Sequence, residues 1–195
     1  MHKARLEAFS DGVLAIVITI MVLELKVPHG EEIAALFPLW PVFLSYALSF
    51  VYIGIYWNNH HHMMQAATKV DGSVLWANLH LLFWLSLLPF ATGWMGENHF
   101  GRWPVVLYGF NLLMAAIAYK FLQSRLAYVE GNESRIAAAI GRDSKGWISP
   151  FLYIAGIVSA FVLAPWTGMA FFVATALLWV VPDRRMERVV GDGRQ

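Results

Sequence analysis

Polar and charged side chains stand at the head of an otherwise apolar N-terminal segment. Arg5 precedes three spacers and then Phe9, Ser10 and Asp11, and mostly aliphatic residues follow. A carboxylate and a hydroxyl in the first turns of a membrane span are costly unless they are partnered, so they indicate a functional site. Hydrogen bonding and ion pairing are the chemistry they offer, because the sequence places no base beside the Ser10 hydroxyl.

Two later apolar segments carry a second set of polar side chains. Three successive histidines spread over about 200° of a helix, so they cannot all bind one metal ion. His60 or His61 is well placed to contact Asp11, because all three lie near the same end of their segments. A structural hydrogen-bond network, a solvated histidine run and a metal site all remain open. The set comprises Trp57, Asn58, Asn59, His60, His61, His62, Asp71, Trp76, Asn78 and His80.

The spacing from Arg5 to Asp11 resembles the signature of the transmembrane protein 175 family of potassium channels. The resemblance continues from Gly12 to Pro28, in the run GVLAIVITIMVLELKVP. It implies a cation channel whose pore is lined by this first helix. Matched to the family from the Phe-Ser-Asp string, Ile16 takes the principal constriction and Thr19 a polar position linked to selectivity. Ile20 and Leu23 take the next layers outward.

The composition places these motifs in a membrane. Hydrophobic residues make up 58% of the chain and charged residues only 14%, whereas a soluble domain carries about a quarter charged residues. Runs of about 20 apolar residues predict an all-α protein with six transmembrane helices in a single domain, residues 1–195. The last two runs predict a helical hairpin, and residues 133–140 a short helix. The predicted spans are 4–26, 38–62, 72–95, 102–123, 147–164 and 166–182.

The basic residues fall almost entirely at one end of the predicted spans. Apart from Lys26 and Arg102, all of the 14 Lys and Arg residues lie at the end that carries both termini. The positive-inside rule therefore predicts cytoplasmic termini, in a multi-pass protein of the plasma membrane. Acidic residues in the opposite loops would attract cations there, although such charges are more often simply solvated. They are Glu24, Glu31, Glu32 and Glu97.

Helical geometry divides the first span into two faces. At about 100° per residue, an apolar stripe falls within an arc of roughly 100°. Ser10 and Asp11 lie more than 100° from its middle, so they should point into neighbouring helices. Ordinary packing or lipid contact explains the stripe from periodicity alone, while the family resemblance implies a pore axis. The stripe consists of Gly12, Ile16, Thr19, Ile20 and Leu23, with Arg5 and Phe9 continuing it.

A pore of this kind has no backbone filter. Nothing like Thr-Val-Gly-Tyr-Gly occurs, so rings of aliphatic side chains, assisted by Thr19 hydroxyls, would select by partial dehydration. Such rings predict weak to moderate preference for potassium over sodium. One six-span chain offers one lining helix, and single-repeat members of the resembled family are tetramers. The sequence therefore predicts a homotetramer with potassium on the axis near Ile16.

Two other function classes are weaker. A proton-coupled or metal-ion-coupled transporter would use the histidines and Asp71, but the inverted repeat and broken helices of carriers are not evident. An enzyme is not expected, because the sequence has no His-Glu-x-x-His, Gly-x-Ser-x-Gly or phosphate loop. The predicted partners are copies of the chain, membrane lipid and monovalent cations, with no nucleic acid. No cofactor is expected beyond the permeant potassium ion.

Overall fold

The fold is all-α, as the sequence predicts. A computed structural model describes residues 3–131, 134 and 144–180, and these contain no strand. The elements are α1 (Lys3–Leu23), the 3-10 helix η1 (Ile33–Leu39), α2 (Trp40–Ala66), α3 (Gly72–Ser86), α4 (Leu88–Glu97), α5 (Arg102–Glu130), α7 (Ser144–Val162) and α8 (Pro165–Val180).

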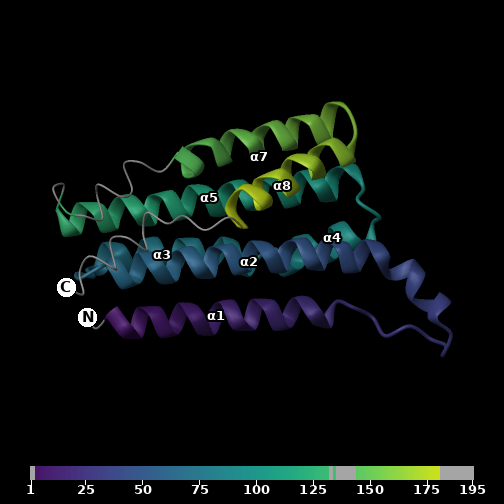
Figure 1. Cartoon of the computed structure of the whole chain (residues 1–195), viewed down its shortest axis with the longest axis horizontal. Coiled ribbons are helices and arrows are strands. Elements are labelled where there is room, and N and C mark those ends of the chain that lie inside the picture. The colour runs from purple at the N-terminus through teal and green to yellow at the C-terminus, as the bar shows by residue number, and fades with distance from the viewer. Residues whose placement is uncertain (1–2, 132–133, 135–143, 181–195) are drawn as a thin grey trace.

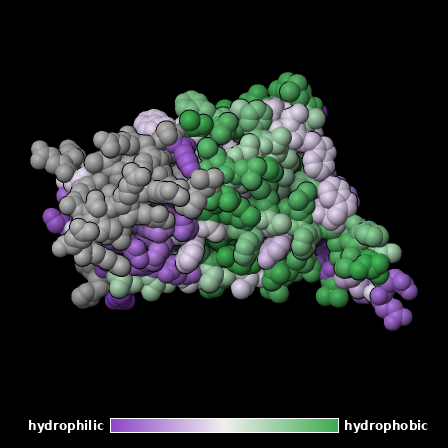
Figure 2. All heavy atoms as spheres, in the orientation of Figure 1, coloured by the Kyte–Doolittle hydropathy of each residue, from purple (hydrophilic) through white to green (hydrophobic). Residues whose placement is uncertain are grey.

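The helices lie side by side in a bundle with α1 on one flank (Figure 1). α1 packs against α2, α3 and α4, while α7 and α8 pack against each other and against α5 on the opposite flank. The start of α1 and the ends of α2 and α5 therefore meet at one end of the bundle. Figure 2 shows hydrophobic side chains across the middle of the visible face, with hydrophilic ones at its ends.

The membrane-length helices agree with the predicted spans in place and differ in their ends. Five helical segments are long and apolar enough to cross a bilayer: 3–23, 33–66, 72–97, 102–130 and 145–162. The multi-span prediction is confirmed. α8 is apolar but has only 16 residues, so its crossing stays a prediction. The predicted helix at 133–140 falls outside the described residues, except for Ser134.

α7 and α8 form the predicted helical hairpin. Leu163 and Ala164 join the two helices, and Gly168 of α8 lies directly against α7. A Cβ atom at residue 168 would come within 2.7 Å of the Gly156 carbonyl oxygen and 2.6 Å of the Ala160 Cβ. Glycine is therefore required here, as in other close crossings of membrane helices.

The helix of the predicted third span is interrupted near Pro89, where the sequence predicts a kink. α3 ends at Ser86 and α4 begins at Leu88, with Leu87 between them. Pro89 has no N–H and its ring crowds the carbonyl four residues earlier, which explains why the helix is interrupted here. The interruption is one residue long and lies inside a single membrane-length segment, residues 72–97.

Asn111 of α5 compensates for the interruption. This residue is 4% exposed. With its amide oriented to suit its neighbours, the nitrogen donates to the Trp84 carbonyl at 2.8 Å and the oxygen accepts from the Leu88 N–H at 3.2 Å. A break inside a membrane is tolerated when side chains satisfy the freed backbone groups, and Asn111 does this for α3 and α4.

Candidate functional site

The two faces of α1 have opposite surroundings. Its buried face contacts the rest of the chain through Leu6, Ser10, Leu14, Val17 and Met21. The stripe is exposed: Ile16 is 58%, Ile20 43% and Leu23 79% accessible, and Arg5, Phe9, Gly12 and Thr19 are exposed as well. The Thr19 hydroxyl donates to the Ile16 carbonyl at 2.9 Å. The stripe is therefore no part of the core of its own chain.

A directed chain of hydrogen bonds fixes the buried face. The Ser10 hydroxyl donates to the Leu6 carbonyl at 2.9 Å, so its oxygen is free to accept from the Asn78 amide, also at 2.9 Å. The Asn78 oxygen then faces His60 Nε2 at 2.8 Å. Because Asn78 Oδ1 can only accept, His60 must carry its proton on Nε2. The buried Nδ1 of His60 has no hydrogen-bond partner among the described residues.

Two further contacts join α1 directly to α2. The Trp57 indole donates to Asp11 Oδ1 at 3.1 Å, and His61 Nδ1 lies 3.0 Å from Glu7 Oε1. Trp57 and His61 stack with ring centroids 6.0 Å apart. Glu7 and Asp11 are one turn apart on α1, and Trp57 and His61 are one turn apart on the antiparallel α2. The two contacts together hold α1 at one rotation.

Other predicted network residues lie elsewhere. Arg5 is exposed and has no hydrogen-bond partner among the described residues, and Asn58 makes none of the contacts to α1. His80 accepts from the Trp84 indole at 3.0 Å, on the exposed side of α3. Asp71 caps α3 by accepting from the Val74 N–H at 2.9 Å, which lowers the pKa of its carboxyl. It is thus a helix cap rather than a transport group.

Lysines tie both ends of α1. Lys3 donates to the Ala67 carbonyl at 3.0 Å, at the end of α2. Beyond the other end of α1, Lys26 forms an ion pair with Glu97, the last residue of α4. The hydrogen bond from Lys26 to Glu97 raises the pKa of the lysine. One of the four predicted outer acidic charges is therefore locally compensated.

Sequence reasoning missed Glu7 and Asn111. A detectable signal existed for Glu7, because Glu7 and Asp11 are four residues apart on α1, as Trp57 and His61 are on α2. No signal in the sequence paired Asn111 with the break at Leu87. Within the described ranges no three His, Asp or Glu side chains gather as metal ligands.

The fold and this site define a class of protein. It is an all-α integral membrane protein whose first helix is anchored by polar bonds on one face and displays an aliphatic stripe on the other. The chain belongs to the TMEM175 family. Residues 5–89 match the family described as endosomal/lysosomal potassium channel TMEM175.

The relatives agree with this assignment. A potassium channel from Chryseobacterium sp. (strain P1-3) is 54% identical over 188 residues, which cover 96% of this chain and 97% of that protein. The human endosomal/lysosomal proton channel TMEM175 is 34% identical over 116 residues, covering 53% of this chain and 23% of the human protein. The crystal structure of a lysosomal potassium-selective channel TMEM175 homolog from Chamaesiphon minutus superposes with a TM-score of 0.80 at 28% identity. That match covers 92% of this chain and 96% of the other.

Proposed function

We propose that this chain forms a homotetrameric channel for monovalent cations, with weak to moderate preference for potassium over sodium. Four copies of α1 surround the axis and Ile16 forms the narrowest ring. Ile20 and Leu23 form apolar rings above it, and Thr19 supplies hydroxyl oxygens. The whole chain acts as one channel domain in the plasma membrane, with both termini in the cytoplasm. Conduction is passive, and no reaction is assigned to the chain.

The exposed stripe of α1 carries this proposal. The polar hydrogen bonds on one face of α1 fix its rotation, and the aliphatic stripe on the other face is exposed within the described part of its own subunit. Lipid contact alone would not require such anchoring. A potassium channel is 54% identical to nearly the whole chain, which supports the proposal that this face lines a pore shared with other copies.

The proposed selectivity follows from dehydration. Aliphatic rings offer an ion no replacement for its water, and the Thr19 hydroxyls offer only part of a coordination shell. Potassium sheds its hydration more readily than sodium, while anions and divalent cations gain nothing at such a ring. Discrimination should therefore be modest rather than sharp.

Reversal potentials measured on the purified full-length chain in planar bilayers test the proposal. Under opposed potassium and sodium gradients the potential should shift toward the potassium equilibrium value and should ignore the chloride gradient. A potential that follows chloride would remove the cation channel. Flux that occurs only with a proton gradient would replace it with a coupled carrier.

A further inference from the structure

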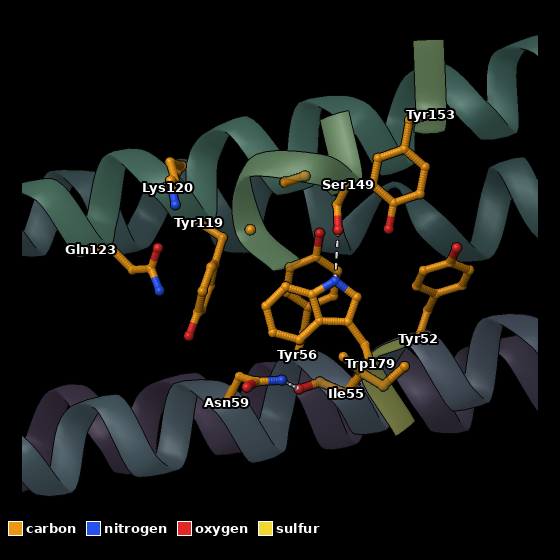
Figure 3. Close-up of a pocket in the computed structure, with 12 residues that line it drawn as sticks. Tyr52, Ile55, Tyr56, Asn59, Tyr119, Lys120, Gln123, Ser149, Tyr153 and Trp179 are labelled. Carbon is orange, nitrogen blue, oxygen red and sulfur yellow. Dashed lines mark hydrogen bonds between the residues drawn. The ribbon is translucent and has the colours of Figure 1, made fainter. Parts of the chain in front are cut away.

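A small cavity with several polar groups in its wall lies between α2, α5, α7 and α8, away from the exposed stripe of α1. Its volume is about 40 Å³. Figure 3 shows side chains of α2, α5 and α7 that converge on this space. The cavity is on the face of α2 opposite Trp57 and His61, since Tyr52, Tyr56 and Asn59 repeat at helical spacing on that face.

Several polar groups in its wall are fully satisfied within the protein. The Tyr52 hydroxyl donates to the Phe172 carbonyl at 2.6 Å. The Trp179 indole donates to the Ser149 hydroxyl at 2.7 Å, and that hydroxyl in turn donates to the Lys145 carbonyl at 2.8 Å. These groups need no further ligand.

Gln123 and Tyr56 differ from those groups. Gln123 is only 4% exposed, and its side-chain oxygen has no hydrogen-bond partner among the described residues. Tyr56 is buried edge-to-face against Tyr119, and its hydroxyl makes no hydrogen bond within the described part of the chain. The Gln123 oxygen is a buried acceptor that is expensive to leave unpaired, and the Tyr56 hydroxyl is a second polar group on the same cavity.

The size and polarity of the cavity select the ligand. A space of about 40 Å³ exceeds the roughly 10 to 15 Å³ that one water molecule needs, yet it is small for an organic molecule. The ligand must donate to the oxygen of Gln123, and the hydroxyl of Tyr56 can then donate to the ligand. An anion cannot donate to Gln123, and the ammonium group of Lys120 in the cavity wall disfavours a metal cation.

We propose that this cavity is a binding site for ordered water, in which water molecules donate to Gln123 Oε1 and accept from the Tyr56 hydroxyl. The water joins α2, which holds the first helix, to α5. This site belongs to one subunit and does not depend on the proposed channel activity.

Thermal unfolding of the full-length chain in lipid nanodiscs tests the proposal. Tyr56→Phe removes the hydroxyl that would bond water, and Tyr52→Phe removes a hydroxyl bonded to protein. If water occupies the cavity, each change should lower Tm by a similar amount, about 2 to 4 °C. Tyr128→Phe at a 70% exposed position is the control and should leave Tm unchanged. An unchanged or raised Tm for Tyr56→Phe would mean a dry cavity and would overturn the proposal.

A density map of the unaltered protein gives an independent readout. A water-sized peak should lie within about 3.2 Å of the Gln123 oxygen. Gln123→Met, which removes the acceptor at similar volume, should abolish that peak. Absence of the peak in a map that resolves other buried water, or a density too large for water, would reject the proposal even if a variant fails to fold.

Discussion

Ile16 and Ser10 lie fewer than two turns apart on α1 and have opposite surroundings. Ser10 is fully buried and takes part in two hydrogen bonds, whereas Ile16 is more than half exposed. Exposing isoleucine is cheap in lipid, whereas exposing a bonded serine and asparagine would leave polar groups unpaired. The rotation of α1 is therefore decided by its polar residues, and the aliphatic stripe takes the direction that remains.

Ile16→Asn tests the constriction at the level of one side chain. In the proposed tetramer, four amides would wet the narrowest apolar ring, so single-channel conductance should rise and the preference for potassium over sodium should fall. Bilayer recordings measure both quantities. Val22→Asn, at an exposed position of α1 outside the stripe, is the matched control and should change neither. Equal currents from the Ile16 variant and the parent would refute a ring at this position.

Asn78→Asp tests the direction of the buried hydrogen-bond chain. The substitution keeps the shape of the side chain but removes the N–H that donates to Ser10. Losing that buried bond should cost about 1 to 3 kcal/mol, and more where the carboxylate stays charged. Thermal unfolding in nanodiscs should show a lower Tm. Asn58→Asp, on α2 and outside the chain of bonds, should have a smaller effect, and equal shifts for both variants would contradict the assignment.

At the scale of elements, the interrupted third span depends on α5. Asn111→Leu would leave the Trp84 carbonyl and the Leu88 N–H without their side-chain partner inside an apolar bundle. We expect a loss of about 1 to 3 kcal/mol, measured as a lower Tm, because the Leu88 N–H becomes unsatisfied and the Trp84 carbonyl keeps only the Leu87 N–H as a donor. The exposed Asn98→Ala change, which removes an amide bonded only within its own turn, serves as the control. Equal stability of the Asn111 variant and the parent would count against the role.

The start of α3 should depend on pH through Asp71. Its carboxylate accepts the Val74 N–H, so its pKa in the folded chain lies below the ordinary 3.8. Because the pKa of Asp71 is lower in the folded chain than in the unfolded chain, the cap stabilises the fold fully at pH values above the unfolded-state pKa. This stabilisation is lost as the pH falls through the folded-state pKa. The difference in Tm between the parent and Asp71→Ala should therefore be constant near neutral pH and shrink below about pH 4. A pH-independent difference would argue against a charged cap.

The helices could be predicted from the sequence more completely than their ends and contacts. Apolar length located α1, α2, α5 and α7, because a bilayer demands about 20 apolar residues whatever the neighbours are. Pro89 was visible, but whether it kinks or breaks a helix depends on Asn111, which is close only in the fold. Periodicity placed Ile16 in one stripe of α1, but it did not decide between packing within the chain, lipid contact and a pore axis. The contact between His61 and Glu7 could not be predicted, because it depends on how α1 is aligned along α2, and long-range packing decides that alignment.

At the scale of the whole molecule, the exposed stripe leaves one face of α1 to be covered by something outside the chain. A helix held at fixed rotation with Ile16, Ile20 and Leu23 directed outward needs either lipid or other copies against it. Four copies around an axis cover this face and align the same residues in rings, which is the arrangement proposed above. The contacts that fix the rotation of α1 within each chain then also decide whether the four α1 stripes can face the proposed axis.

Asp11→Ala should therefore damage assembly more than ion preference. The change removes the acceptor of the Trp57 indole. Without this hydrogen bond, the rotation of α1 beside the proposed axis is less well fixed. Native mass spectrometry of the protein released from nanodiscs should show a smaller tetramer fraction, while the tetramers that form should keep their preference for potassium. Trp57→Phe, which loses the same bond but keeps the carboxylate, should weaken assembly similarly. Stable tetramers that had lost only selectivity would instead place the Asp11 carboxylate in the permeation path.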